Sequence, residues 1–435
     1  MALVPLNIEH LPVALHADPA RVVLRPFMPA DTVLPGHSST EHRNAVIDRI
    51  LALGAREAED ALARVLGVLS KRHENAAGIL DRRFIDIVDF RPDLAAAGSD
   101  IARLIGACFT EEYAFEAAAL FNPCIVPHPL QAGAPHGGLR FILSLRAVGE
   151  GHVSSIVFRT GLISPDGGVS VDPAGSKPIS ARAERIPGAS EDLPGLRLTC
   201  ADGGDLGDIV LFPASQAHRG GLEDLRLIAF EDDTRARAWL GTLTGVGSNT
   251  IRQEMLRTTD FASFDLTPIT GPYAATKGMA LFPERVGGRY AMLGRPDHDS
   301  LWLMHSSDLY HWEDGTPVIA PAAIWESVQI GNCGSPIPLP EGWLVITHGV
   351  GPLRTYSIGA CLLDRGDPSR LIARLDRPLI APGARQWSGY VPNTVYSCGG
   401  LVHAGLLYLP YGVADSFATI ARVAVKDLLS AMTPC

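Results

Sequence analysis

Gly342-Trp-Leu-Val-Ile346 is a short apolar run that begins at a glycine, and two other segments have the same form. They are Gly288-Arg-Tyr-Ala-Met-Leu293 and Gly405-Leu-Leu-Tyr-Leu409, and the three starts lie 54 and 63 residues apart. Runs rich in β-branched and aromatic residues, bounded by turn residues, are typical of strands. Recurrence at this distance corresponds to about one four-stranded blade of a β-propeller.

A second internal similarity links residues 257–265 to residues 305–313. Both segments fit a strand that ends in small hydroxyl residues and is followed by an Asp turn. Residues 123–435 alternate such strands with Gly, Pro, Asp and Asn, and their 313 positions suffice for about five blades. We therefore predict an all-β five-bladed β-propeller. A pair of β-sandwiches is the alternative, but it would not explain the repeat.

The N-terminal quarter of the chain has a different pattern. The first 40 residues are rich in proline and predict an extended arm, whereas residues 42–73 carry apolar side chains at helical spacing. A second helical stretch is expected over about 74–120, broken near Arg91-Pro92 and Gly98, with Asp100 as a candidate cap. We expect an N-terminal extended arm and helical region over 1–120, and the propeller over 121–435.

Composition excludes several classes of protein. Asp and Glu number 47 against 37 Lys and Arg, a net charge of -10, so we expect no nucleic-acid partner. No run of 18 apolar residues occurs, and the start lacks a basic region followed by an apolar run. We therefore expect no membrane partner and no signal peptide, and a cytoplasmic location. The seven scattered cysteines favour reduced thiols, and no metal or dinucleotide motif is present.

Polar residues follow several of the predicted strands. Gly220-Gly-Leu-Glu-Asp-Leu-Arg226 places two adjacent carboxylates and an arginine before an apolar strand. Lys277, His348 and Asp415 stand beside other apolar strands. Each one alone fits a solvated or hydrogen-bonded structural residue. Their repetition in successive presumed blades favours one shared site in the central funnel of the propeller.

Six segments, taken in order, resemble glycoside hydrolase family 130, the inverting mannoside phosphorylases and related mannosidases with a five-bladed propeller. The segments are Phe121-Asn-Pro-Cys-Ile-Val-Pro127, residues 221–226, Ala280-Leu-Phe-Pro-Glu284, residues 342–349, residues 356–368 and Tyr411-Gly-Val-Ala-Asp415. The N-terminal helices and residues 143–155 resemble the longer members, some of which act on β-1,2-mannooligosaccharides. The resemblance covers roughly residues 120–430 and agrees with the predicted fold.

The resemblance also implies residue roles. Asp224 matches the family's proton donor. The phosphate-binding positions match Arg252, Lys277, His348 and Tyr356. Asn122, Arg146 and Asp415 match the positions that contact the mannose at the cleaved bond, and we expect Glu223 and Arg226, beside the acid, to bind the substrate as well. An inverting phosphorylase needs only one carboxyl, because phosphate arrives as an ionised nucleophile that cationic side chains hold.

The chain departs from the family pattern at three places. The usual Glu-Asp-Pro-Arg is Glu223-Asp-Leu-Arg226, and the usual Tyr-Tyr-Gly is Pro410-Tyr-Gly412. Gln253 and Glu254 follow Arg252, where small or apolar residues are common. Arg257 is the alternative candidate for the phosphate-binding arginine, and Glu254 would be the base for water if the enzyme were a hydrolase.

We predict an enzyme that uses inorganic phosphate to release α-mannose 1-phosphate from β-1,2-linked mannooligosaccharides, with no other cofactor and no metal. A hydrolytic β-mannosidase of the same fold and a non-catalytic carbohydrate-binding propeller are the alternatives. The three-carboxylate set of other five-bladed glycosidases cannot be assembled here. A homo-oligomer is compatible with the sequence, and the N-terminal helices would pack on the propeller, line a subunit interface or wall the aglycone side of the funnel.

Overall fold

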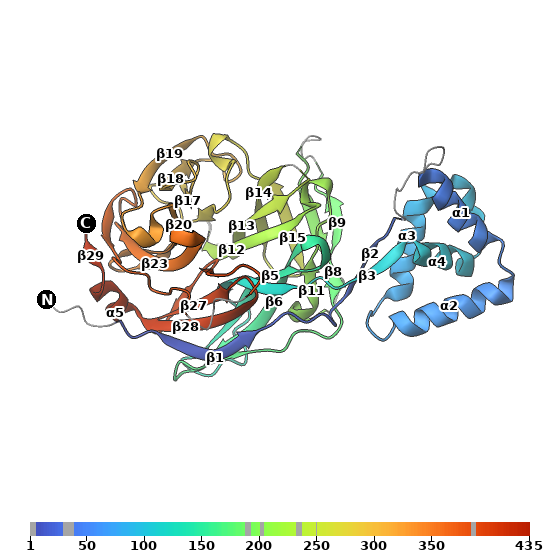
Figure 1. Cartoon of the computed structure of the whole chain (residues 1–435), viewed down its shortest axis with the longest axis horizontal. Coiled ribbons are helices and arrows are strands. Elements are labelled where there is room, and N and C mark those ends of the chain that lie inside the picture. Colours follow the sequence, from blue (N-terminus) through green and yellow to red (C-terminus); the bar gives the residue numbers. More distant parts are fainter. Residues whose placement is uncertain are drawn as a thin grey trace. The chain divides into compact units, whose positions relative to one another are not determined.

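The computed structural model describes residues 6–28, 39–187, 193–200, 204–231, 237–248, 250–383 and 389–435. The chain forms two compact units (Figure 1). The β-rich unit consists of Met1–Asp18, Glu116–Gly175 and Ala181–Cys435, and the helical unit consists of Pro19–Phe115 and Ser176–Ser180.

The described helices are α1 (Ser39–Leu51), α2 (Ala55–Leu69), α3 (Ala76–Val88), α4 (Ser99–Cys108) and α5 (Val425–Ser430). The strands up to residue 211 are β1 (Glu9–Leu15), β2 (Val23–Pro26), β3 (Thr110–Tyr113), β4 (Ala119–Pro127), β5 (Leu139–Val148), β6 (Ser154–Ile163), β7 (Val169–Val171), β8 (Ile179–Ser180), β9 (Arg182–Arg185), β10 (Leu196–Thr199) and β11 (Ile209–Leu211). The next are β12 (Gly221–Glu231), β13 (Arg237–Val246), β14 (Ile251–Thr258), β15 (Ser263–Pro268), β16 (Ala280–Leu281), β17 (Tyr290–Gly294), β18 (Leu301–Ser306), β19 (Asp314–Ile319), β20 (Gln329–Asn332) and β21 (Ile337–Leu339). The last are β22 (Gly342–Gly351), β23 (Thr355–Leu363), β24 (Leu371–Arg374), β25 (Val395–Tyr396), β26 (Leu401–His403), β27 (Leu406–Val413), β28 (Phe417–Ala424) and β29 (Thr433–Pro434).

The helical unit packs α1, α2 and α3 around α4. Apolar residues at helical spacing, among them Ile47, Leu62 and Ile105, are buried in its two cores. Asn75 is the N-cap of α3. Its side chain accepts a hydrogen bond from the amide of Gly78 in the first turn of that helix. A Cβ at Gly106 would collide with the carbonyl oxygen of Leu80, so glycine lets α4 approach α3 closely.

Two N-terminal expectations need correction. Gly98, not Asp100, is the N-cap of α4, and Asp100 lies in the first turn, where its charge complements the helix dipole. The second helical stretch ends at Cys108 rather than near 120, because 110–113 pairs with β2 as strand β3 and β4 starts at Ala119.

The proline-rich arm also forms strands. β1 pairs antiparallel with β28, so an arm segment joins the sheet of the chain's C-terminal residues. β2 instead pairs with β3 within the helical unit. The parts of the expected arm at residues 1–5 and 29–38 lie outside the described residues.

The β-rich unit is built from antiparallel sheets that follow one another along the chain (Figure 1). The largest has the order β4-β5-β6-β12-β13-β14-β15-β10-β9, and a short parallel pairing of β6 with β12 joins its two halves. The next sheets have the orders β16-β17-β18-β19 and β20-β22-β23-β24-β29. The last has the order β1-β28-β27-β25, with β26 beside β27.

Apolar cores lie between the two halves of the largest sheet and between successive sheets. One core joins β4–β6 to β12–β15, and the next joins β12–β14 to β16–β18. Further cores join β17 and β18 to β22 and β23, and β22 and β23 to β27 and β28. β27 and β28 in turn contact β4. Each sheet therefore packs on its neighbour in chain order, and the last packs on the first.

The repeats found in the sequence correspond to equivalent positions in this arrangement. The three glycine-led runs lie in β17, β22 and β27, in three different sheets. In the second repeat, Asp260 accepts hydrogen bonds from the amides of Ala262 and Ser263, and Asp308 accepts one from Tyr310. The prediction of a mostly β chain is confirmed. None of the helices in the described ranges is long and apolar enough to cross a membrane.

We predict that Gly221→Ala lowers the free energy of unfolding by about 2 to 4 kcal/mol. Gly221 has φ 131° and pairs with Ser154 where the two halves of the large sheet join, and a Cβ there would lie 2.5 Å from the Ser154 amide nitrogen. Urea denaturation measures the effect. Gly133→Ala is the control, because Gly133 has φ 86° but open space around it. Equal losses in the two variants would contradict the prediction.

Candidate active site

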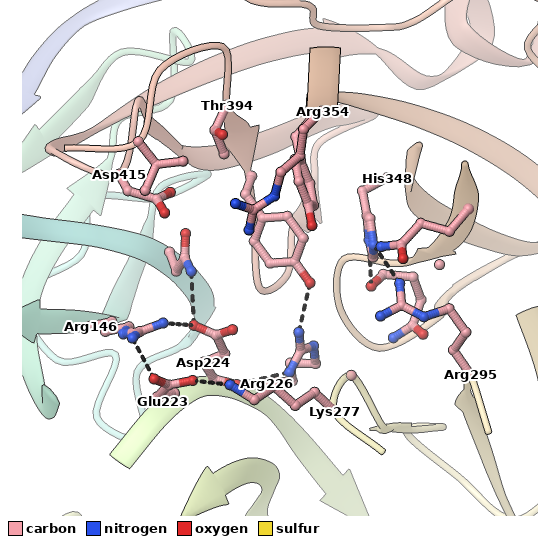
Figure 2. A pocket seen from close by; sticks show the side chains of 18 residues that line it. Arg146, Glu223, Asp224, Arg226, Lys277, Arg295, His348, Arg354, Thr394 and Asp415 are labelled. Atoms are coloured by element: carbon pink, nitrogen blue, oxygen red, sulfur yellow. Dashed lines mark hydrogen bonds and ion pairs between the residues drawn. The ribbon is translucent and has the colours of Figure 1, made fainter. Parts of the chain in front are cut away.

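A cavity of about 280 Å³ lies in the β-rich unit (Figure 2), and its wall is formed by strands of three of the sheets and by the loops next to β16 and β17. Its lining residues are Asn122, Arg146, Glu223, Asp224, Arg226, Lys277, Gly278, Arg295, Gln329, Gly331, Asn332, His348, Arg354, Tyr356, Val391, Thr394, Tyr396 and Asp415. Nine of the ten site residues predicted from the sequence therefore line one pocket, and only Arg252 does not.

A local irregularity in β12 brings two neighbouring carboxylates into this pocket. Adjacent side chains of a regular strand point to opposite faces. The pairing of β12 with β13 shifts between Glu223 and Arg226, and Asp224 has a left-handed φ of 56°. Such a bulge redirects side chains, so Glu223 and Asp224 both reach the pocket.

The Asp224 carboxylate is held by donors from two other strands. Asn122 Nδ2 in β4 donates to its Oδ1 at 2.8 Å, and Arg146 Nη1 in β5 lies 3.4 Å from the same oxygen. Burial would raise the pKa of Asp224, but the charges of Arg146 and Arg226 and the hydrogen bond from Asn122 lower it below its usual value. The carboxyl is therefore ionised in the free pocket.

Glu223 neutralises two of the pocket's cations. Its Oε1 lies 2.5 Å from Arg146 Nη2, and its Oε2 lies 2.6 Å from Lys277 Nζ (Figure 2). Arg146 thus bridges the two adjacent carboxylates, and Lys277 is anchored at the wall that carries Asp224. The Arg146–Glu223 pair is largely buried and is therefore less screened than a surface ion pair, whereas the Lys277 side chain is 41% exposed.

Arg226 is a buried support beneath the acid. Its guanidinium donates to the carbonyl of Cys333 at 3.1 Å, to the carbonyl of Asp224 at 3.1 Å and to the Tyr396 hydroxyl at 2.8 Å. These bonds tie the irregular part of β12 to β25 and to the residue after β20. The arginine therefore fixes the backbone that presents Asp224.

His348 in β22 is neutral and fully engaged. Its Nδ1 lies 3.2 Å from the carbonyl of Asn332 and donates to it, so its Nε2 accepts from Arg295 Nη1 at 3.1 Å. Burial, then the charges of Arg295 and Arg226, lower the pKa of His348 well below its usual value. The Tyr356 ring stacks on the imidazole with 6.0 Å between ring centroids.

Asp415 is a second carboxyl in the pocket. It follows β27 with φ 48°, and Figure 2 shows its side chain directed toward the region of Asp224. Burial, reinforced by the negative charge of Asp224, raises the pKa of Asp415 to about 6. The environments of the two aspartates therefore shift their pKa values in opposite directions, a pattern found at sites of acid–base chemistry.

Arg252 points away from the pocket, which is a correction to the sequence-based assignment. In the sheet, Gln253 pairs with Thr244, and Thr244 pairs with Glu223. Paired residues share a face and successive residues alternate, so Gln253 shares the face of Glu223 and Arg252 takes the other. There, Arg252 Nη2 lies 2.6 Å from Glu254 Oε1.

The other residues considered around Arg252 also lie elsewhere. Glu254, the candidate base of a hydrolase, is buried, does not line the pocket and lies 2.6 Å from His218 Nε2. Arg257, the alternative arginine, is exposed and does not line the pocket.

Sequence reasoning missed two cations and several polar groups in the wall. Arg295 follows β17, Arg354 precedes β23, and Asn332, Thr394 and Tyr396 lie among them. Arg295 had a usable signal, because it directly follows the glycine-led strand at 288–294, the position at which charged residues were sought in other strands. Arg354 lies in the short turn before β23, and the sequence alone does not indicate that this turn borders the pocket.

Across the described segments, no group of three or more His, Cys, Asp or Glu side chains could hold a metal ion. The pocket wall is instead dominated by cations, with five Arg or Lys side chains against three carboxyls. Such a wall is suited to a ligand that combines hydroxyl groups with an anion.

A family model confirms the resemblance read from the sequence. The model for glycoside hydrolase family 130, described as beta-1,4-mannooligosaccharide phosphorylase, matches residues 207–433, more than half of the chain. The chain therefore belongs to this family.

Individual relatives match over shorter stretches. A 1,2-beta-oligomannan phosphorylase from Thermoanaerobacter sp. (strain X514) is 40% identical over 154 residues, 35% of this chain and 52% of the relative. A beta-1,2-mannobiose phosphorylase from Listeria innocua is 28% identical over 228 residues, 50% of this chain and 62% of the relative. The chain thus spans about half the length of the curated relatives it matches.

The fold is shared with solved structures. A crystal structure of a putative glycoside hydrolase from Bacteroides ovatus ATCC 8483 aligns with a TM-score of 0.53 at 22% identity. The alignment covers 73% of this chain and 90% of that structure.

We predict that Asp415→Asn stabilises the protein at pH 7.5 by about 1 to 2 kcal/mol and has a smaller effect near pH 4.5. The fold favours the neutral carboxyl, so the stability this group contributes is complete below its usual pKa of 3.8 and is lost as the pH rises through about 6. The amide never ionises and avoids that loss. Urea denaturation at both pH values measures the difference.

Asp314→Asn is the matched control, because Asp314 is exposed and lies outside the pocket. The same stabilisation by Asp415→Asn at both pH values, or a pH dependence equal to that of the control, would contradict the prediction.

Proposed function

We propose that the protein is an inverting β-mannoside phosphorylase that acts on β-1,2-linked mannooligosaccharides and releases α-mannose 1-phosphate. The family assignment supports the reaction. The choice of the β-1,2 linkage is supported by two of the relatives described above, which are named as phosphorylases of β-1,2-linked mannosides. The observation that carries the proposal is one pocket that combines Asp224 with an excess of cations in a chain of net charge -10.

The chemistry requires one acid and one anion site on opposite faces of the sugar. A phosphate oxygen attacks C1 of the terminal mannose as the bond from C1 to the glycosidic oxygen breaks. Asp224 supplies the proton that the leaving oxygen takes up. Phosphate already carries its negative charge, so no second carboxylate is needed to activate it, and cations must hold it instead.

The electrostatics of Asp224 suit such a two-substrate reaction. In the free pocket its carboxyl is ionised, because neighbouring arginines and Asn122 outweigh the effect of burial. A bound phosphate offsets the positive charges, and a bound sugar displaces water. Both changes raise the pKa of Asp224, so the protonated acid forms in the complex that needs it.

The remaining predicted residues have roles consistent with their contacts. Asn122 and Arg146 orient Asp224 and border the place of the mannose, together with Asp415. Glu223 anchors Lys277, and Arg226 fixes the backbone of the acid. Lys277, His348 and Tyr356 belong to the phosphate side of the proposed site.

We also propose a five-bladed propeller for the β-rich unit. Its blades would be built on β4–β6, β12–β15, β16–β19, β20–β24 and β25–β28, with β1 added to the last. The packing of each sheet on the next, and of the last on the first, supports this closure. The division into a helical region over 1–120 and a catalytic propeller over 121–435 is part of the same proposal, except that β1 and the start of β4 at Ala119 belong with the propeller.

Incubation of the protein with β-1,2-mannobiose, with and without inorganic phosphate, tests the function. We expect α-mannose 1-phosphate and mannose only when phosphate is present, and phosphorus NMR identifies the product and its anomeric form. Release of free mannose alone, independent of phosphate, would show a hydrolase. No reaction with β-1,2- or β-1,4-linked substrates, together with sugar binding, would show a binding protein.

Asp224→Asn provides the control for the acid. We expect turnover to fall by about 10² to 10⁴-fold while the variant still binds mannobiose. Glu313→Gln, a carboxyl-to-amide change at an exposed residue, should leave turnover unchanged. Unchanged turnover in Asp224→Asn would remove this residue from the mechanism.

A further inference from the structure

Two aromatic side chains lie together on the sheet of β16–β19. The ring centroids of Tyr273 and Trp302 are 5.9 Å apart, and the ring planes meet at 48°. Both side chains are partly exposed, whereas Trp312 and Trp343 are fully buried in the cores between the sheets. A group of aromatic side chains that remains open to solvent favours a binding surface.

This pair lies beside the pocket and not within it. Gly294, the last residue of β17, pairs with Trp302 near the start of β18, and the next residue, Arg295, lines the pocket. Tyr273 stands four residues before Lys277, which also lines the pocket. Four residues span at most about 14 Å. Neither aromatic residue lines the pocket itself, so the pair borders the pocket wall from outside.

A hydrogen bond fixes the orientation of the Trp302 indole. Its Nε1 donates to Asp297 Oδ2 at 2.7 Å. The other oxygen of Asp297 accepts from the amides of Asp299 and Ser300 at 3.0 and 2.9 Å. The carbonyl of Asp299 in turn accepts from the amide of Ile330 in β20 at 2.9 Å. The loop that holds the ring is therefore anchored to the neighbouring sheet, and a ligand would lose less affinity to ordering it.

The Tyr273 ring rests on the backbone of β19. A Cβ at Gly315 would lie 3.0 Å from Tyr273 Cε1, so the ring occupies the space in front of this glycine. Trp302 pairs with Pro317, two residues after Gly315, and residues two apart in a strand share a face. Pro317 is exposed. Tyr273, Trp302 and Pro317 therefore form one continuous surface, named the aromatic surface below.

The chemistry of the aromatic surface fits a sugar ring. One side of a pyranose presents C–H groups, whose small positive charges are attracted to the negative face of an aromatic ring. The hydroxyl groups at the edge of the sugar need hydrogen-bonding partners. The Asp297 carboxylate lies at the edge of the indole, and each of its oxygens has two lone pairs. The exposed Thr316 lies next to Pro317.

We propose that the aromatic surface is a second, non-catalytic sugar-binding site, which holds outer units of a mannooligosaccharide whose terminal mannose occupies the pocket. This inference rests on the proposed function. Mannobiose reaches the pocket alone, whereas a longer chain contacts both places. Two linked contacts raise the affinity for the long chain and leave the catalytic groups unchanged. The aromatic surface thus gives the enzyme a preference for longer substrates.

Steady-state kinetics with β-1,2-mannobiose and β-1,2-mannohexaose at saturating phosphate test the proposal. We expect Trp302→Ala and Tyr273→Ala each to raise the KM for mannohexaose about 5- to 10-fold. The KM for mannobiose and the kcat for both sugars should stay unchanged. Trp302→Phe should recover part of the loss, because it keeps an aromatic face and lacks only the indole N–H.

Tyr290→Ala is the matched control. Tyr290 is a partly exposed aromatic residue at the start of β17, where it pairs with Ser306 at the opposite end of the same sheet. It does not line the pocket, and its loss should leave both KM values unchanged. Equal rises in the KM of both sugars for Trp302→Ala, or the same rise for Tyr290→Ala, would overturn the proposal.

Calorimetric titration without phosphate separates this site from the proposed function. We expect mannohexaose to bind the wild type about 5- to 10-fold more tightly than mannobiose, and Trp302→Ala to lose this difference. If mannobiose is not turned over with phosphate, the proposed function fails, and the titration alone decides on the sugar site. No binding, or equal affinities for the two sugars, would overturn it. So would a changed oligomeric state of Trp302→Ala in light scattering, which would assign the aromatic surface to a second copy of the chain.

Discussion

The charge of two adjacent carboxylates, Glu223 and Asp224, is the constraint on which the pocket depends. The shift in the β12–β13 pairing turns both side chains into one pocket, where each is largely buried. Charges removed from water must be paired. Arg146 and Lys277 compensate them directly, while the buried Arg226 secures the backbone between them. These three cations come from three different strands or loops, so the acid can be assembled only when the sheets pack around the pocket.

The cations of the wall therefore divide into two groups. Arg146 and Lys277 form ion pairs with Glu223, and their charges lower the pKa of Asp224. Arg295 and Arg354 are oriented by uncharged groups, His348 and Tyr356, and retain their charge. An anion that binds to the second group would also weaken the field that keeps Asp224 ionised. Binding of the nucleophile and protonation of the acid are coupled in this way, and the net charge of -10 describes the rest of the surface rather than this pocket.

Local sequence was sufficient where a property depends on neighbours in the chain. Glycine-led apolar runs predicted β17, β22 and β27, and charged residues at strand ends predicted Asp224, Lys277, His348 and Asp415 as lining residues. Local sequence was not sufficient where the pairing between strands decides which face a side chain takes. A shift of one residue in register reverses the face of a strand, so Arg252 and Gln253 could not be told apart before the pairing with Thr244 was known. The partner of β1 lies about 400 residues away in sequence, beyond any local pattern.

A crystal structure of the protein with β-1,2-mannobiose and phosphate tests the account most directly. The account predicts a phosphate held by the cationic side chains that line the pocket. The glycosidic oxygen should then face Asp224 from the opposite side of the terminal mannose. Phosphate bound at Arg252, or phosphate and Asp224 on the same side of the sugar ring, would contradict it.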